Sequence, residues 1–300
     1  MSIQSGSQTF NIIPTTNSNI KQVTFDTPFD EVPVVVCCIS DTGPNFGFGY
    51  LTCSAMDVTK TGFTIKTNQT QGWMQAHPGG QITVFWMAVP EGSTSQSLVG
   101  SSNQFNIEKF EPSEKSQYSQ AVTFPAGYDG GTSPQIIYSL SDAGPHSLTG
   151  YLSCMSLDIS EAGFTEYIKL YDVGGWGRPG VKGGPTNYNY LAIDKSASAT
   201  PKPVLSGTAP FTIQPYPRTK ATWKTQYEVD IKFETPFDDI PTIVCGMSNA
   251  APNIDQGYLT CMAWQVSKTG FTAVIKVIDV TNNTAFYDAG GPITLSWIAK

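Results

Sequence analysis

The chain has 300 residues, of which 14% are charged and 12% are aromatic, and it contains 28 glycines and 21 prolines. Its net charge of −7 gives no electrostatic case for nucleic acid or an anionic membrane, so we expect neither as a partner. There is no apolar run of about 18 residues, so we predict no transmembrane helix and no membrane insertion. Low charge combined with many turn-forming residues indicates an all-β protein.

The same series of elements occurs three times along the chain. Each copy opens with a short strand, at residues 5–12, 100–107 and 205–213. A turn rich in Pro and Asp follows, at residues 23–33, 121–134 and 231–241. The motif GYLTC or GYLSC comes next, at residues 49–53, 150–154 and 257–261, and a Gly-Phe pair and a closing aromatic strand complete each copy. We therefore predict three domains of ordinary size, namely repeat 1 (1–90), repeat 2 (98–194) and repeat 3 (204–300).

Alternation of apolar and polar residues within each repeat predicts β-strands. In the motif strand of repeat 1, Leu51, Cys53 and Ala55 share one face. The apolar runs 32–39 and 240–247 are typical of a central strand buried between two sheets. The glycine of each Gly-Phe turn is expected to adopt a positive φ. Five to six such strands in each repeat predict a small antiparallel sandwich.

The six cysteines do not fit a disulfide framework. Cys37 and Cys53 have the same spacing as Cys245 and Cys261, but repeat 2 has a tyrosine, Tyr138, at the first position. We therefore interpret these cysteines as reduced thiols at small apolar core positions. Their spacing also lacks the paired CxxC pattern of a zinc site, and we predict neither a metal nor a cofactor.

The ordered motifs resemble the H-type lectin domain of snail agglutinins and of the C-terminal part of discoidins. The resemblance rests on F-x-x-P-F-x-x-x-P-x-V, a serine-ended strand, V-T-K-T-G-F, a tryptophan and an aromatic-x-A closing strand, and it is weaker in repeat 2. It implies a six-stranded antiparallel β-sandwich that forms trimers and binds N-acetylgalactosamine-type sugars near the protomer interfaces. Three linked copies then form either a pseudo-trimer within one chain or three stacked trimeric rings in three chains.

The loop after the Gly-Phe strand contains the main ligand candidates. They are Gln71, Trp73 and His77 in repeat 1, Trp176 and Arg178 in repeat 2, and Tyr287 in repeat 3. An aromatic side chain among polar groups suits a sugar ring, but it equally suits packing against its own loop or a neighbouring repeat. The family's arginine from the strand after the preceding loop has no counterpart in residues 50–56, which leaves the sugar specificity open.

A second loop precedes the GYL motif and contains Asp41 in repeat 1 and Asp142 in repeat 2. Either carboxylate is a candidate acceptor for sugar hydroxyl groups. The alternative is a turn in which the aspartate bonds to its own backbone, and the sequence favours that interpretation.

Two functions remain open, and neither is enzymatic, because no catalytic motif is present and the two histidines lie in non-equivalent loops. The first is a carbohydrate-binding adhesion protein that recognises glycans or a glycosylated cell surface at up to three weak sites. The second is a virion structural protein, such as a phage fibre, that associates with itself or with other virion proteins. The chain start lacks a signal peptide pattern, so we expect synthesis in the cytoplasm and non-classical release to a virion or extracellular surface.

Overall fold

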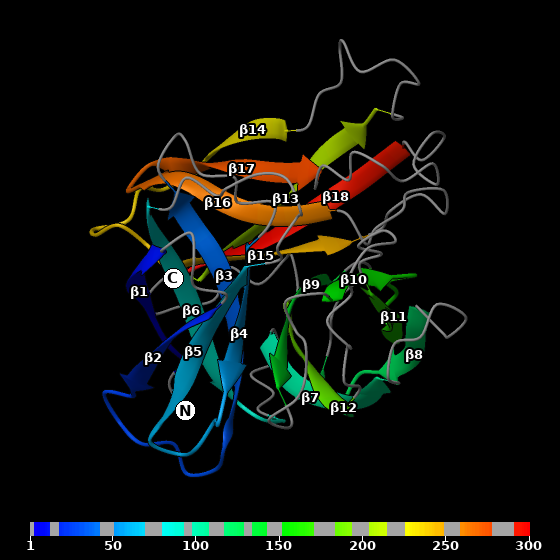
Figure 1. Cartoon of the computed structure of the whole chain (residues 1–300). Helices are drawn as coiled ribbons and strands as arrows, with labels where there is room; N and C mark the ends of the chain where they lie inside the picture. Colours follow the sequence, from blue (N-terminus) through cyan, green and yellow to red (C-terminus); the bar gives the residue numbers. More distant parts are fainter. Residues whose placement is uncertain are drawn as a thin grey trace, which may run out of the picture.

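All regular elements in the described part of the chain are β-strands (Figure 1). The computed structural model describes residues 3–12, 18–42, 51–69, 80–92, 98–107, 117–128, 134–142, 152–170, 184–193, 204–214, 226–248, 259–277 and 291–300. The predicted all-β class is therefore confirmed.

Six strands fall within each predicted repeat. Repeat 1 contains β1 (Gln4–Ile12), β2 (Ser18–Thr24), β3 (Pro33–Thr42), β4 (Leu51–Met56), β5 (Gly62–Gln69) and β6 (Gly80–Pro90). Repeat 2 contains β7 (Leu98–Ile107), β8 (Gln117–Thr123), β9 (Gln135–Asp142), β10 (Leu152–Leu157), β11 (Gly163–Leu170) and β12 (Gly184–Ile193). Repeat 3 contains β13 (Leu205–Ile213), β14 (Gln226–Lys232), β15 (Ile243–Ser248), β16 (Leu259–Ser267), β17 (Gly270–Val277) and β18 (Gly291–Ala299).

The strands form three six-stranded sheets, and each sheet is shared by two repeats. The strand orders are β1-β6-β3-β16-β17-β14, β13-β18-β15-β10-β11-β8 and β2-β5-β4-β9-β12-β7. Each sheet therefore joins an antiparallel group of three strands from one repeat to an antiparallel group from another. Because repeat 1 shares a sheet with repeat 3, repeat 3 with repeat 2 and repeat 2 with repeat 1, the three connections form a closed cycle (Figure 1).

The three junctions between repeats use equivalent residues. Each junction is a short parallel pairing between a serine near the end of one strand and a motif-strand residue of another repeat. The pairs are Ser40 with Ala263, Ser248 with Ser156, and Ser141 with Ala55. All three serines are buried, and the Ser40 hydroxyl donates to the Ala263 carbonyl oxygen at 2.9 Å. The serine-ended strand of the sequence pattern is thus the strand that connects neighbouring repeats.

The central strand of repeat 1 is buried on both faces, as the apolar run predicts. Val35, Cys37 and Ile39 of β3 pack in a cluster with residues of β1, β2, β4, β5 and β6. Val34, Val36 and Cys38 belong to a second cluster that includes residues of repeats 2 and 3. One face of β3 therefore belongs to the interior of its own repeat, and the other lies in the core shared by all three repeats.

Four aromatic rings form the centre of each repeat, and their arrangement is the same three times. In repeat 1, the Phe63 and Trp86 ring centroids lie 5.4 Å apart in an edge-to-face pair, and Phe25 and Phe29 lie 4.9 Å apart. The same two pairs occur at 4.9 and 4.9 Å in repeat 2 (Phe164–Tyr190, Phe124–Tyr128) and at 5.4 and 5.1 Å in repeat 3 (Phe271–Trp297, Phe233–Phe237). All of these rings are buried, except that of Phe237, which is partly buried.

The predicted positive φ is found at one of the three Gly-Phe turns, at Gly270 with a φ of 159°, and not at Gly62 or Gly163. Glycine is required there because of a close approach, since an added Cβ would lie 1.9–2.2 Å from a backbone carbonyl oxygen of the facing strand. The left-handed residues are instead Asp57, Asp158 and Gln265, at equivalent positions directly before the turn.

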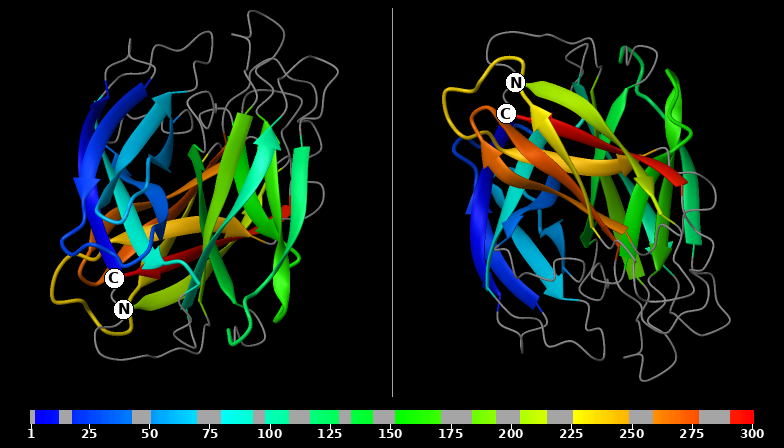
Figure 2. Two further views of the ribbon diagram at one scale, coloured as in Figure 1. Left: turned by 90° about the horizontal axis from the view of Figure 1, so that it is seen from below. Right: turned by 90° about the horizontal axis from the view of Figure 1, so that it is seen from above.

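All six cysteines are free, and Cys37, Cys38 and Cys245 lie in the core, while Cys53, Cys154 and Cys261 are half-buried. The last strand, β18, is drawn in red in Figure 2 and leads to the C-terminus, where the Lys300 ammonium donates to the Ile3 carbonyl oxygen. This contact joins the first strand of repeat 1 to the end of repeat 3.

Candidate functional site

The strand register brings the boundaries of three segments to one end of each repeat. In repeat 1, Ile12 pairs with Gly80, Ser18 with Asn68, Leu51 with Gln69, and Thr42 with Ile82. The strands that border residues 13–17, 43–50 and 70–79 therefore begin and end at the same place. Repeats 2 and 3 have the same register. This end of each repeat is the one that borders the predicted ligand loops.

The two candidate aspartates lie at the ends of strands. Asp41 is the unpaired residue of a β-bulge in β3, between Ser40 and Thr42. Asp142 is the last residue of β9 and pairs with Thr186 of its own repeat. It also pairs with Met56, which ends β4 of repeat 1. The backbone of both aspartates is therefore held next to a junction between repeats, and the choice between a ligand contact and a turn stays a prediction at these two positions.

The remaining site candidates are outside the described residues. They are Gln71, Trp73, His77, Trp176, Arg178 and Tyr287. Their assignment to a ligand site stays a prediction. The structure does fix the strand ends from which these segments start and to which they return, at Gln69 and Gly80, Leu170 and Gly184, and Val277 and Gly291.

Each junction brings the loop-bearing end of one repeat to the opposite end of another. Met56, which pairs with Asp142, is followed by the left-handed residue Asp57. Gln265, the equivalent of Asp57 in repeat 3, lies two residues after Ala263, which pairs with Ser40. Left-handed backbone at non-glycine residues is uncommon, and here it recurs three times beside the junctions. A site at one of these ends would thus be built from two repeats, which is the interface position that the family resemblance implies.

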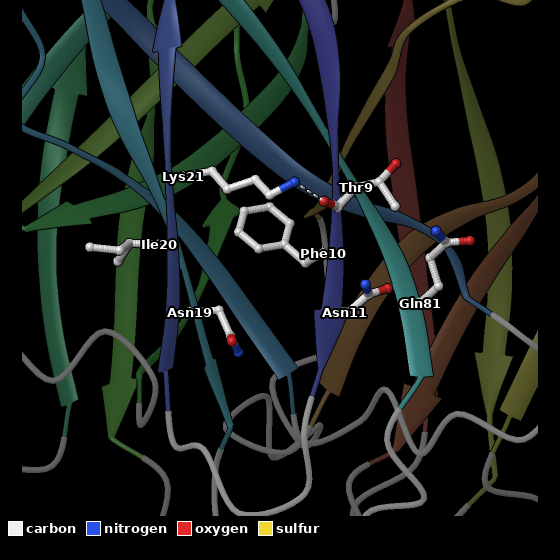
Figure 3. A pocket seen from close by; sticks show the side chains of 7 residues that line it. All are labelled: Thr9, Phe10, Asn11, Asn19, Ile20, Lys21 and Gln81. Carbon is white, nitrogen blue, oxygen red and sulfur yellow. Dashed lines mark hydrogen bonds between the residues drawn. The ribbon is translucent and has the colours of Figure 1, made fainter.

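A pocket of about 440 Å³ lies elsewhere, at the outer edge of repeat 1 (Figure 3). It is lined by residues 9–11 of β1, residues 19–21 of β2 and Gln81 of β6. Both β1 and β2 are edge strands of their sheets. The Lys21 ammonium lies 5.4 Å from the centre of the Phe10 ring and donates to the Thr9 carbonyl oxygen at 2.5 Å. No residue of this pocket was among the sequence candidates. The pattern of a single strand does not show where the edge strands of two different sheets leave a space between them.

The interior of repeat 2 contains a polar group of four residues that crosses between its two sheets. Ser156 is paired with Glu166 on neighbouring strands, and Tyr188 with Asn103. Across the sheets, Asn103 Nδ2 donates to Glu166 Oε1 at 2.7 Å, and the Ser156 and Tyr188 hydroxyls are 3.0 Å apart. Glu166 is fully buried, and its Oε2 atom has no hydrogen-bond partner. Burial raises the pKa of Glu166 to about 7, against the smaller opposing effect of the Asn103 hydrogen bond.

These groups do not form a metal site within the described residues. No cluster of three His, Cys, Asp or Glu side chains there has the arrangement to hold a metal ion. Burial raises the pKa of the Cys53, Cys154 and Cys261 thiols, which keeps them protonated and poor nucleophiles. The same part of the chain has no helix that could cross a bilayer.

Comparison with known proteins identifies two parts of the chain. Residues 20–89 and residues 228–299 each match the family model of the H-type lectin domain. Comparison with curated proteins and with solved structures gives no match. The family resemblance is therefore confirmed in repeats 1 and 3, whereas membership of repeat 2 stays a prediction.

Proposed function

Residues 20–89 and 228–299 of this chain are H-type lectin domains, and from this we propose that the protein binds carbohydrate and is not an enzyme. The family match is the observation that carries the proposal. The proposed sites are at the loop-bearing ends of the repeats, where Trp73 and Trp176 provide faces for a sugar ring. Gln71, His77, Arg178, Tyr287, Asp41 and Asp142 complete the candidate set.

We propose that each repeat is a β-sandwich and that the three repeats form a pseudo-trimer within one chain. Two observations support this arrangement, namely the cyclic sharing of the three sheets and the equivalent junctions at Ser40, Ser141 and Ser248. A single chain then already contains the interfaces that separate protomers supply in a trimer. The expected solution mass is that of one chain, 32.4 kDa, and a mass three times larger would favour stacked rings of three chains.

Three linked sites give avidity for a surface that presents many glycans. Linking converts the second and third binding events into intramolecular ones, so weak individual sites still produce firm attachment. We propose adhesion to a glycosylated surface as the role of the full chain, with a virion or extracellular surface as its place of action. A virion structural role remains the second candidate, because the same closed set of sheets also suits a rigid assembly unit.

A glycan array probed with the full chain tests the carbohydrate proposal. We expect binding to a defined subset of glycans, and a signal at least about tenfold weaker for Trp73→Ala or Trp176→Ala. Ile240→Ala is the matched control, because Ile240 is 64% exposed and precedes β15, at the opposite end of its repeat from Ser248. Absence of any glycan signal, together with a large assembly in light scattering, would replace the lectin proposal by the structural one.

A further inference from the structure

The pocket between β1 and β2 exists because repeat 1 lacks a side chain that the other repeats have. The register places Asn19 of β2, Tyr118 of β8 and Tyr227 of β14 at the same position, five residues before the residue that faces the glycine of the Gly-Phe turn. Tyr118 and Tyr227 are 5% and 6% exposed and belong to the core. Asn19 is much smaller, so the corresponding ring is missing from the outer edge of repeat 1.

The polar groups around this space have unused hydrogen-bonding capacity. Asn19 Nδ2 is buried and has no hydrogen-bond partner. In repeat 3 the tyrosine at this position is satisfied, because the Tyr227 hydroxyl accepts a hydrogen bond from the Gln214 backbone N–H at 2.8 Å. Figure 3 shows Asn19 and Lys21 of β2 on the same side of β1 as the Phe10 ring, whereas the side chains of Asn11 and Gln81 lie on the other side of β1. A buried donor without a partner is costly, so an occupant that accepts a hydrogen bond is favoured over an apolar one.

We propose that this edge pocket of repeat 1 binds one hydroxylated six-membered ring, in chemical terms a single sugar residue of a glycan. Its volume of about 440 Å³ lies within the usual range for small-ligand sites. The Asn19 amide supplies both a donor and an acceptor, as adjacent hydroxyl groups require. The Lys21 ammonium has three donors, of which the Thr9 carbonyl oxygen takes one. The site is separate from the loop-bearing end and needs none of the loop candidates.

Amide chemical shifts of the full chain test the proposal directly. The probes are the methyl glycosides of glucose, galactose, mannose and N-acetylgalactosamine, each added separately at millimolar concentration. We expect at least one of them to shift the resonances of Thr9, Asn19 and Gln81 in a saturable way. If none of the four shifts these resonances, the proposal is wrong.

Asn19→Tyr is the decisive variant, because it introduces the side chain that repeats 2 and 3 carry at this position and is therefore compatible with the fold. Filling the pocket should weaken binding at least about tenfold and raise the melting temperature. Asn19→Ala enlarges the pocket but removes the amide, and it should also weaken binding. Shifts of the same size in Asn19→Tyr would overturn the proposal.

Trp73→Ala separates this site from the proposed loop sites. It should leave the shifts of Thr9, Asn19 and Gln81 unchanged, whatever it does to the glycan array. A silent array with saturable shifts at the edge pocket would remove the loop proposal and keep this one. Loss of the edge shifts in Trp73→Ala would instead show that the two are a single site, against the present inference.

Discussion

Repeat 2 keeps the strand register of repeats 1 and 3, but its interior is polar where theirs is apolar. Glu166, Ser156 and Tyr188 of repeat 2 occupy the positions of Ile65, Ala55 and Val84 in repeat 1. In repeat 3 the same three positions are Ala273, Ala263 and Leu295. Glu166 and Ser156 have no exposed surface, like the apolar residues that they replace.

This contrast distinguishes the residues that specify the fold from the side chains that only fill the interior. The close-approach glycines, the aromatic pairs and the junction serines are present in all three repeats. The side chains between the sheets differ, and the family match covers the two repeats whose interiors are apolar. The architecture therefore depends on a small set of close contacts, whereas the remaining interior has changed independently in repeat 2.

The largest expected effect concerns the glycine that faces the central tryptophan in repeats 1 and 3. An added Cβ at Gly207 would lie 2.4 Å from Trp297 Cζ2, whereas repeat 2 has Ser101 opposite the smaller Tyr190. Gly207→Ser should lower the free energy of unfolding by about 3 kcal/mol through overpacking. Ser101→Gly should cost about 1 kcal/mol, mainly for the lost hydrogen bond to Tyr190. Chemical denaturation of both variants measures the difference, and equal costs would show that the two repeats are packed alike at this point.

The second prediction uses pH to expose the polar interior of repeat 2. The pKa of Glu166 is raised to about 7 in the folded protein from an ordinary value of 4.5, so the folded state holds this proton more tightly than the unfolded state does. The tighter proton binding by folded Glu166 therefore raises the free energy of unfolding. This contribution is complete below pH 4.5 and is lost as the pH rises through 7. Between pH 5 and 8 we expect a loss of about 2 kcal/mol that can be assigned to Glu166.

Glu166→Gln isolates this contribution, because it keeps a hydrogen-bonding side chain but cannot ionise. The difference in unfolding free energy between the variant and the unaltered protein should grow in favour of the variant as the pH rises from 5 to 8. Urea titrations at several pH values measure it. A difference that is independent of pH would show that Glu166 titrates normally and that the interior is more hydrated than its burial indicates.

The third prediction tests how the repeats fit together at the centre of the molecule. Tyr138 of repeat 2 replaces the cysteine of repeats 1 and 3, and Gly246 of repeat 3 provides the space, since an added Cβ there would lie 3.1 Å from the Tyr138 ring. The Tyr138 hydroxyl also accepts a hydrogen bond from the Met247 backbone N–H at 2.8 Å. Gly246→Cys should therefore cost about 1–2 kcal/mol.

A double-mutant cycle decides whether the two residues depend on each other. Tyr138→Cys alone leaves a cavity and an unpaired N–H. In combination with Gly246→Cys, the larger side chain at position 246 fills part of the space that the tyrosine ring leaves. The double variant should be more stable than the sum of the single effects predicts, by about 1 kcal/mol. Additive costs would mean that Gly246 is small for a reason unrelated to Tyr138.

The sequence predicted the repeats, the all-β class and the core positions because all of these depend on local patterns. Alternation marks the buried face of a strand, and the run at 34–39 indicates burial on both faces. It did not reveal that each sheet is shared by two repeats, because the pairing of Ser40 with Ala263 joins residues more than 200 positions apart and has no local signal. The edge pocket was not predicted for a similar reason. Asn19 can be compared with Tyr118 and Tyr227 only when the strand register shows that the three residues occupy the same position.

The smallest expected effect concerns the surface of the Gly-Phe turn, where repeats 1 and 3 again differ from repeat 2. The Lys60 ammonium lies 3.3 Å from the Glu31 carboxylate and also donates to the Asp30 carbonyl oxygen, and Lys268 of repeat 3 makes the equivalent contacts with Asp239 and Asp238. Repeat 2 has Glu161 at this position.

Exposed ion pairs contribute little to stability, so Lys60→Ala should lower the free energy of unfolding by about 0.5 kcal/mol, and this cost should shrink in high salt. Glu161→Ala should change the unfolding free energy by less than that and show no such salt dependence. Parallel denaturation curves at low and high salt distinguish the two, and a larger cost at Lys60 that persists in high salt would assign its role to the backbone contact with Asp30 rather than to charge.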